Sequence, residues 1–250
     1  LWILAGSISH QEPSTSFREW IIGIFSLMGL LSPFVLALYF ILPDQQLRKD
    51  LKRRILNIHA IKGEYLLITF FLMFVSILIA QVVSLVFGYS TDQFQFRGGF
   101  TFSSAIFPVW FLLLAAPLLE ELAWHSYGTD SLRARFNLLN ASLIFALFWG
   151  LWHLPLSFIR DYYHSNLVAS GWEYSLNFMV SLFPFVLIMN WLYYKTERNL
   201  LLPVIFHITA GFFNEIFATH PMSKVIQTGL LLLFSVYLIW KDKAFFLKSI

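Results

Sequence analysis

Long apolar segments recur along the whole chain, and they constrain its fold more than any other feature. A helix needs about 20 apolar residues to cross a hydrocarbon core of ~30 Å, and seven segments reach roughly this length. Only 12% of the residues are charged, whereas a soluble domain carries about 25%. The sequence therefore predicts an all-α polytopic membrane protein with about seven transmembrane helices. The predicted spans are residues 20–42, 65–87, 104–127, 138–157, 173–193, 200–218 and 224–240.

The charged loops predict how these spans are oriented. Most of the 17 lysines and arginines lie in every second loop, and cytoplasmic loops are enriched in these residues. We therefore expect a cytoplasmic C-terminus in an integral protein of a bacterial cytoplasmic membrane, with the lipid bilayer as its surroundings. The net charge of +3 reflects these loops, so nucleic acid is not an expected partner. The basic segments are residues 43–64, 128–137, 194–199 and the tail after 240.

The first basic loop contains an amphipathic pattern. Leu47, Leu51 and Ile55 would share one face of a helix, with the basic residues on the other face. This pattern fits a helix that lies on an anionic cytoplasmic leaflet. It fits equally well a simple determinant of membrane topology.

A single membrane domain, residues 1–250, is expected because no repeat or low-complexity linker divides the chain. The chain contains no cysteine, which excludes disulfides, thiol catalysis and cysteine metal ligands. Residues 1–6 are interpreted as the end of a further span rather than as a signal peptide.

Two adjacent acids, Glu120 and Glu121, follow an uncharged stretch that covers residues 107–119. A carboxylate at membrane depth costs several kcal/mol and therefore usually marks a functional site. We expect the helix to continue past both acids to about Gly128, which would place them inside the bilayer. The alternative, a structural acid capped by a neighbouring helix, suits a lone glutamate better than a pair.

Helical geometry gives the two acids different roles. Neighbouring residues on a helix point ~100° apart, so Glu120 and Glu121 cannot serve the same point. Glu121 and His125 are four residues apart and share a face, so we expect His125 to donate to Glu121 and offset its charge. Glu120 is then free to face a cavity, where a desolvated carboxylate suits a general base acting on water.

Two later apolar segments each bring a histidine, His153 and His207. Trp149 lies one turn before His153 and is expected to pack against it, and Gly150 permits another helix to approach closely. Asn214 lies two turns after His207 on the same face. The remaining histidines fall in loops or at span ends and are interpreted as ordinary: His10, His59, His164 and His220.

Three stretches on successive predicted spans together resemble the CPBP family, which comprises the CAAX prenyl endoproteases and the bacterial Abi-type, bacteriocin-processing relatives. The family pattern is a Glu-Glu-x-x-x-Arg motif, a Phe-x-x-x(-x)-His motif and a His-x-x-x-Asn/Asp motif. The resemblance covers about residues 104–215, and we interpret residues 104–217 as a family-like catalytic core. The matching stretches are Glu120-Glu-Leu-Ala-Trp-His-Ser-Tyr-Gly128, Phe148-Trp-Gly-Leu-Trp-His-Leu-Pro-Leu156 and Leu201-Leu-Pro-Val-Ile-Phe-His207.

The resemblance implies an intramembrane endopeptidase that uses an activated water to cleave a peptide near the cytoplasmic leaflet. Glu120 would be the base and His153 would orient the water or stabilise developing charge. His207 would complete the site on the oxyanion side. No cofactor is implied, and the substrate would be a peptide or protein, prenylated or bacteriocin-like. The supporting residues would be Glu121, His125, Trp149 and Asn214.

Two positions depart from the family pattern. The arginine position is His125, whose side chain is shorter and whose charge is titratable. The asparagine position is Gly211. Asn214 would lie about 10 Å from His207 along a helix axis, which argues against direct replacement. The loss of one oxyanion donor costs ~10²–10³ in rate.

Two other functions stay open on the sequence. The departures favour a non-catalytic scaffold of the same fold, such as an immunity-type protein that binds a partner in the membrane. A metal-dependent hydrolase is the third candidate. Its ligands would be Glu120, His153 and His207, because two histidines and a carboxylate can hold Zn²⁺ with one open position.

Overall fold

The computed structural model describes residues 1–12, 15–104 and 106–248, and these residues form helices joined by loops. The long helices are α2 (Ser16–Ile41), α4 (Gly63–Leu85), α5 (Val109–Ala123), α7 (Leu138–His153), α9 (Trp172–Lys195), α10 (Leu201–Ile216) and α11 (Pro221–Lys241). The shorter helices are α1 (Trp2–Ser9), α3 (Gln45–Leu56), α6 (Thr129–Arg133), α8 (Tyr163–Ser170) and α12 (Lys243–Leu247). Single turns form η1 (Ile58–Ala60), η2 (Thr91–Phe94), the π-helical turn η3 (Trp124–Gly128) and η4 (Leu154–Phe158).

The predicted all-α membrane architecture is confirmed. Every predicted span overlaps one long helix, and five helices are long and apolar enough to cross a membrane: 16–41, 63–85, 138–158, 172–195 and 221–241. The other two predicted spans correspond to α5 and α10, which have 15 and 16 residues.

The third predicted span begins later than expected. α5 begins at Val109 rather than near residue 104, because Pro108 has an extended backbone and stands at the helix N-cap. A residue before proline, here Phe107, also disfavours the α conformation. At its other end the helix continues as predicted, through η3 and into α6.

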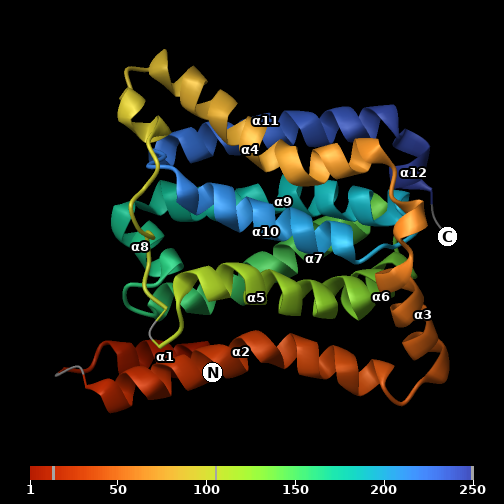
Figure 1. Ribbon diagram of the computed structural model, residues 1–250, viewed down its shortest axis with the longest axis horizontal. Helices are drawn as coiled ribbons and strands as arrows, with labels where there is room; N and C mark the ends of the chain where they lie inside the picture. The colour runs from red at the N-terminus through yellow and green to blue at the C-terminus, as the bar shows by residue number, and fades with distance from the viewer. Residues whose placement is uncertain (13–14, 105, 249–250) are drawn as a thin grey trace.

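The helices lie roughly side by side (Figure 1), with α1 and α2 along one edge and α4 and α11 along the opposite edge. α2 packs on α5, α7 packs on α9, and α10 packs against α4, α5 and α9. The middle of the bundle is therefore enclosed by α5, α7, α9 and α10. Trp149, Leu192 and Phe206, from three of these helices, have at most 1% of their surface exposed.

The two ends of the bundle differ in charge. Figure 1 places α3, α6 and α12, which belong to the basic segments, at one end of the bundle. α8 and the loop before α5 lie at the opposite end. This separation agrees with the alternation of basic loops in the sequence. Which end faces the cytoplasm stays a prediction.

The amphipathic helix α3 contacts the bundle through its apolar face. Its N-terminus is capped by Asp44, whose carboxylate accepts from two backbone N–H groups. Leu47 and Leu51 pack against the main apolar core, so in this structure that face is covered by protein. Arg54 is only 1% exposed, which corrects the expectation that the basic residues of this helix lie on the opposite face.

Arg54 connects α3 to the site region. Its guanidinium donates to the carbonyl oxygens of His125 and Ser126 at 3.0 and 2.9 Å, and to Asp130 Oδ2 at 2.8 Å. These carbonyls belong to the π turn η3, where regular helical hydrogen bonding is interrupted. We refer to the buried or half-buried group Asp50, Arg54, Asp130, Tyr193, Tyr194 and Arg198 as the Arg54 cluster.

Candidate active site

Both acids of the pair are buried near the C-terminal end of α5. Glu120 is 6% exposed and Glu121 is fully buried. The predicted pairing of Glu121 with His125 is confirmed, because His125 Nδ1 is hydrogen-bonded to Glu121 Oε2. The burial of two carboxylates requires partners that replace water, and the two acids find them on different sides of α5.

Glu121 is the centre of a closed network. Its Oε1 atom accepts from His207 Nδ1 at 2.7 Å, while His125 holds Oε2. His125 Nε2 lies 2.9 Å from Asn190 Oδ1, and Asn190 Nδ2 donates to Ser142 Oγ at 2.8 Å. We refer to Glu121, His125, Asn190 and His207 as the Glu121 cluster.

The hydrogen-bond roles in this cluster define where its protons lie. Ser142 donates its own proton to the carbonyl of Leu138, so the group of Asn190 that faces Ser142 must be its NH₂. Asn190 therefore presents its oxygen to His125 Nε2. The Glu121 carboxylate also only accepts. Both ring nitrogens of His125 thus lie beside hydrogen-bond acceptors, in the position where the family pattern has an arginine.

Glu120 faces a cavity on the other side of α5. Trp149 Nε1 donates to Glu120 Oε2 at 3.0 Å, which the sequence did not indicate. The cavity has a volume of about 340 Å³ and is lined by residues of α1, α2, α5, α7, η4 and α8 and of the neighbouring loops, including Glu120 and His153. Glu120 therefore has one oxygen held by an indole and borders a space where a substrate can lie.

His153 borders the same cavity from the end of α7. Its Nδ1 atom donates to the carbonyl oxygen of Trp149 at 2.7 Å, which leaves Nε2 as the remaining polar atom of the ring. The predicted packing of Trp149 on His153 is confirmed, with ring centroids 5.4 Å apart. Gly150 permits close approach as predicted, since a side chain there would meet Met179 of α9.

A second cavity, of about 280 Å³, adjoins the first at His153. It is bordered by Trp149, His153 and His207, and its remaining walls come from α4, α5, α8, α9, α10 and α11. Both cavities share His153, His164, Tyr162, Leu112 and Ala116. The three predicted catalytic side chains are thus arranged around two adjoining spaces, with His153 common to both.

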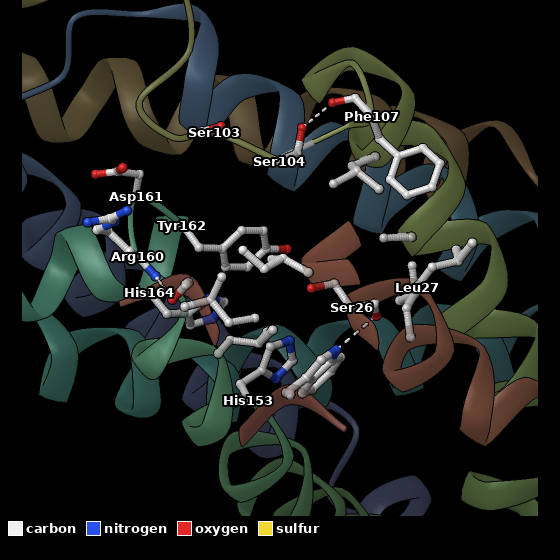
Figure 2. Close-up of a pocket in the computed structure, with 18 of the residues that line it drawn as sticks. Ser26, Leu27, Ser103, Ser104, Phe107, His153, Arg160, Asp161, Tyr162 and His164 are labelled. Carbon is white, nitrogen blue, oxygen red and sulfur yellow. Dashed lines mark hydrogen bonds between the residues drawn. The ribbon is translucent and has the colours of Figure 1, made fainter. Parts of the chain in front are cut away.

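His164 was interpreted as ordinary in the sequence, but it lies in the site region. It is 9% exposed, and its ring stacks on His153 with centroids 5.3 Å apart. Figure 2 shows His153, Tyr162 and His164 on the side of the first cavity opposite Ser26 and Leu27 of α2. Burial lowers the pKa of His164 well below its usual value. Neither ring nitrogen of this neutral ring has a hydrogen-bond partner among the described residues.

Asn214 does not lie beside His207. Its amide donates to Tyr163 Oη at 3.2 Å and to Glu215 Oε1 at 3.3 Å, at the other end of the second cavity. Gly211, at the family's asparagine position, borders that cavity, and a Cβ there would have ordinary contact with Leu113. The expectation that Asn214 is no direct replacement agrees with this placement.

The residues considered as metal ligands are not grouped around one point. His153 and His207 each use Nδ1 for a hydrogen bond within the protein. In the part of the chain that the structure describes, no three histidine, aspartate or glutamate side chains are grouped so as to hold a metal ion. Glu120, His153 and His207 therefore do not form a ligand set in this arrangement.

Glu120, His153 and His207 border two adjoining cavities within an all-α membrane bundle, as expected of an intramembrane hydrolase. Residues 102–213 match the sequence profile of the Rce1-like type II CAAX prenyl endopeptidases. The chain is also 37% identical to CAAX prenyl protease 2 of Methanococcus maripaludis over 240 residues, which cover 94% of this chain and 89% of that protein. The chain therefore belongs to the Rce1-like CAAX prenyl endopeptidase family, as its resemblance to CPBP proteins predicted. It is an integral membrane protease of this type.

Proposed function

We propose that Glu120 activates a water molecule that hydrolyses a peptide bond of a membrane-bound substrate. The observation that carries this proposal is the contrast between the two acids. Glu121 is closed off by His125 and His207, whereas Glu120 borders a cavity together with His153. A carboxylate held by one donor and otherwise facing a substrate space is the group best placed to accept a proton.

The proposed chemical step needs no covalent enzyme intermediate. Water donates one proton to Glu120 and a hydrogen bond to Nε2 of His153, and its oxygen forms a bond to the peptide carbonyl carbon. The carbonyl oxygen becomes an oxyanion, and His207, protonated on both ring nitrogens in this proposal, donates to it from Nε2 in the second cavity. When the C–N bond breaks, the proton on Glu120 passes to the leaving amine, and Glu120 returns to its starting state.

The Glu121 cluster positions His207 for this step. The hydrogen bond from Nδ1 to Glu121 fixes the orientation of the His207 ring, so that Nε2 is the ring atom left for the substrate. His125 is hydrogen-bonded to Glu121 without entering either cavity. The family's arginine position is thereby occupied by a histidine with a second anchor on Asn190.

The proposed substrate is a prenylated protein that ends in a CAAX sequence, since the Methanococcus relative is named a CAAX prenyl protease. The prenyl group would reach the cavities through the bilayer. Five helices of the chain are long and apolar enough to cross it. A bacteriocin-like peptide is the alternative substrate. The bacterial cytoplasmic membrane remains a predicted location.

The leaflet of cleavage is also a prediction, and the structure makes it testable. Residues that border the first cavity, such as Ser103 and Asp161, come from loops at the end of the bundle opposite the basic segments. Because the chain has no cysteine, single cysteines at Ser103 and at Lys243 can be labelled in cells with a membrane-impermeant maleimide. Labelling of Ser103→Cys alone would place that end outside and contradict cleavage near the cytoplasmic leaflet.

The proposed function is tested by cleavage of an S-farnesylated CAAX peptide by purified wild-type protein and by Glu120→Gln. We expect kcat/KM to fall about 10²–10⁴-fold in the variant, which is the usual contribution of a general base, with an unchanged thermal unfolding midpoint. The exposed acid Glu64 at the start of α4 provides a control, Glu64→Gln, that should retain activity. Equal cleavage by wild type and Glu120→Gln would exclude Glu120 as the base.

The non-catalytic alternative is favoured by one observation. Gly211 supplies no side-chain donor at the family's asparagine position, and Asn214 is turned to Tyr163 and Glu215. Gly211→Asn distinguishes the two functions. A proteolytic protein should keep or gain activity with this added amide, whereas a well-folded wild type and variant that both fail to cleave the peptide would support a binding role.

A further inference from the structure

The second cavity has a cationic end that the catalytic step does not use. Its walls are mostly apolar, but Lys224 of α11 borders it together with Asn214 and Glu215 of α10. The Lys224 ammonium lies 5.7 Å from the centre of the Tyr163 ring, and Tyr163 accepts a hydrogen bond from Asn214. This end is therefore composed of Lys224, Tyr163, Asn214 and Glu215.

Lys224 is not neutralised by a close ion pair. The charged groups that act on it are Glu215 and Arg97. Both carboxylate oxygens of Glu215 already accept from Thr101, at 2.8 to 2.9 Å. Among the described residues, no carboxylate oxygen lies within 4.0 Å of the Lys224 nitrogen. An ammonium group at the end of an apolar cavity favours an anionic ligand group.

The distance along α10 between His207 and Asn214 indicates which anionic group fits. His207 and Asn214 are seven residues apart on α10, which is about 10 Å along the axis. Three residues of extended peptide also span about 10 Å. A C-terminal CAAX sequence has three residues after its prenylated cysteine, and they end in a free carboxylate.

We propose that Lys224 and the Tyr163 hydroxyl, at the end of the second cavity, bind the C-terminal carboxylate of the substrate, while the apolar walls hold the residues before it. This inference rests on the proposed function and defines its substrate more narrowly. Lys224 is a binding residue in this proposal, since it contacts the substrate about three residues from the scissile bond. The site selects chain ends over internal peptide bonds.

The test compares an S-farnesylated CAAX peptide with its C-terminal amide. Wild type should prefer the free acid about tenfold to a hundredfold in kcat/KM, the usual worth of one hydrogen bond to a charged group. Lys224→Met should cleave the two peptides within about twofold of each other, and Lys224→Arg should keep the preference. Lys241→Met, at the far end of the same helix, is the matched control and should behave like wild type.

A binding measurement separates failure of this inference from failure of the proposed function. The tripeptide Val-Leu-Leu, as free acid, should raise the thermal unfolding midpoint of wild type more than its amide does, and Lys224→Met should abolish this difference. This result needs no cleavage. Absence of an acid preference in wild type, or an unchanged preference in Lys224→Met, would overturn the assignment even if Glu120-dependent cleavage is observed.

Discussion

The Arg54 cluster and the Glu121 cluster are both buried and charged, yet only the Glu121 cluster reaches a cavity. Arg54 is surrounded by two carbonyl oxygens, Asp50, Asp130 and a tyrosine hydroxyl. In the Glu121 cluster, His207 borders the second cavity and keeps one ring nitrogen outside the network. Dense pairing around Arg54 indicates a structural role, whereas an incomplete set of partners at His207 leaves capacity for a substrate.

The two clusters meet at a single residue. The side chain of His125 is bound to Glu121, and its carbonyl oxygen accepts from Arg54 and from Tyr193 at 3.0 and 2.7 Å. The structural cluster therefore holds the backbone from which the functional cluster projects. Variants that break one cluster at a time should separate stability from activity.

The largest expected effect is that of Glu121→Gln. The glutamine amide has one acceptor oxygen where the carboxylate has two, so either His125 or His207 loses its acceptor in a buried position, which costs about 3 kcal/mol. Activity should fall at least as far as in Glu120→Gln, and the unfolding midpoint should fall as well. A variant with wild-type thermal stability would show that Glu121 is not the centre of a buried charge network.

Arg54→Met should lower stability by about 2–3 kcal/mol, because the buried carbonyl oxygen of Ser126 loses its donor, whereas Asp50 and Asp130 keep Arg198 as a partner. The surviving folded fraction should keep most of its specific activity, since Arg54 borders neither cavity. The neighbouring Arg53 has a side chain that is 67% exposed, so Arg53→Met should cost at most about 1 kcal/mol. Denaturant titration in detergent measures both, and equal effects would contradict the structural role of Arg54.

Asn190→Leu should have an intermediate effect. It removes the acceptor of His125 Nε2, and a buried donor left without a partner costs about 1–3 kcal/mol. Ser142→Ala, one step further from His125, should cost less because Asn190 can still accept. The thermal unfolding midpoints of the two variants check this order. The reverse order would mean that Asn190 does not hold His125.

The smallest expected effect is a pH dependence at the basic end of the bundle. Partial burial acts to raise the pKa of Asp242, but hydrogen bonds from Trp191 and Lys195 outweigh it and lower the pKa. The ionised form therefore stabilises the fold above the unfolded-state pKa of about 3.9, and this contribution is lost as the pH falls through the folded-state value.

Asp242→Asn should consequently be less stable than wild type at neutral pH, by less than about 1 kcal/mol, and the difference should shrink below about pH 4. Unfolding midpoints measured across this range test the sign. A difference that grows with acidity would contradict the lowered pKa of Asp242.

Local spacing was enough to predict the parts of the site that lie on one helix. The four-residue separation of Glu121 and His125 and the position of Trp149 beside His153 follow directly from helical geometry. The hydrogen bond from Trp149 to Glu120 and the bridge from Glu121 to His207 join separate helices. Such contacts depend on how helices pack, which spacing along one chain does not specify.

Two residues escaped prediction for different reasons. His164 lies outside the apolar segments and reaches His153 only because η4 and α8 fold back over the end of α7. Arg54, in contrast, carried a signal. It lies three residues after Leu51 and seven after Leu47, on the apolar face of its helix. A charge on an apolar face indicates a buried partner, here Asp130.

The π turn η3 changes the direction in which the side chains after it point, relative to those of α5. Each residue of an α-helix advances the side-chain direction by about 100°, and a π turn accommodates one additional residue. α6 is therefore rotated by about that angle relative to an uninterrupted continuation of α5. Glu121 can face His207 while Asp130 faces Arg54. The rotation at the π turn therefore allows one continuous helical segment to contribute Glu121 to the Glu121 cluster and Asp130 to the Arg54 cluster.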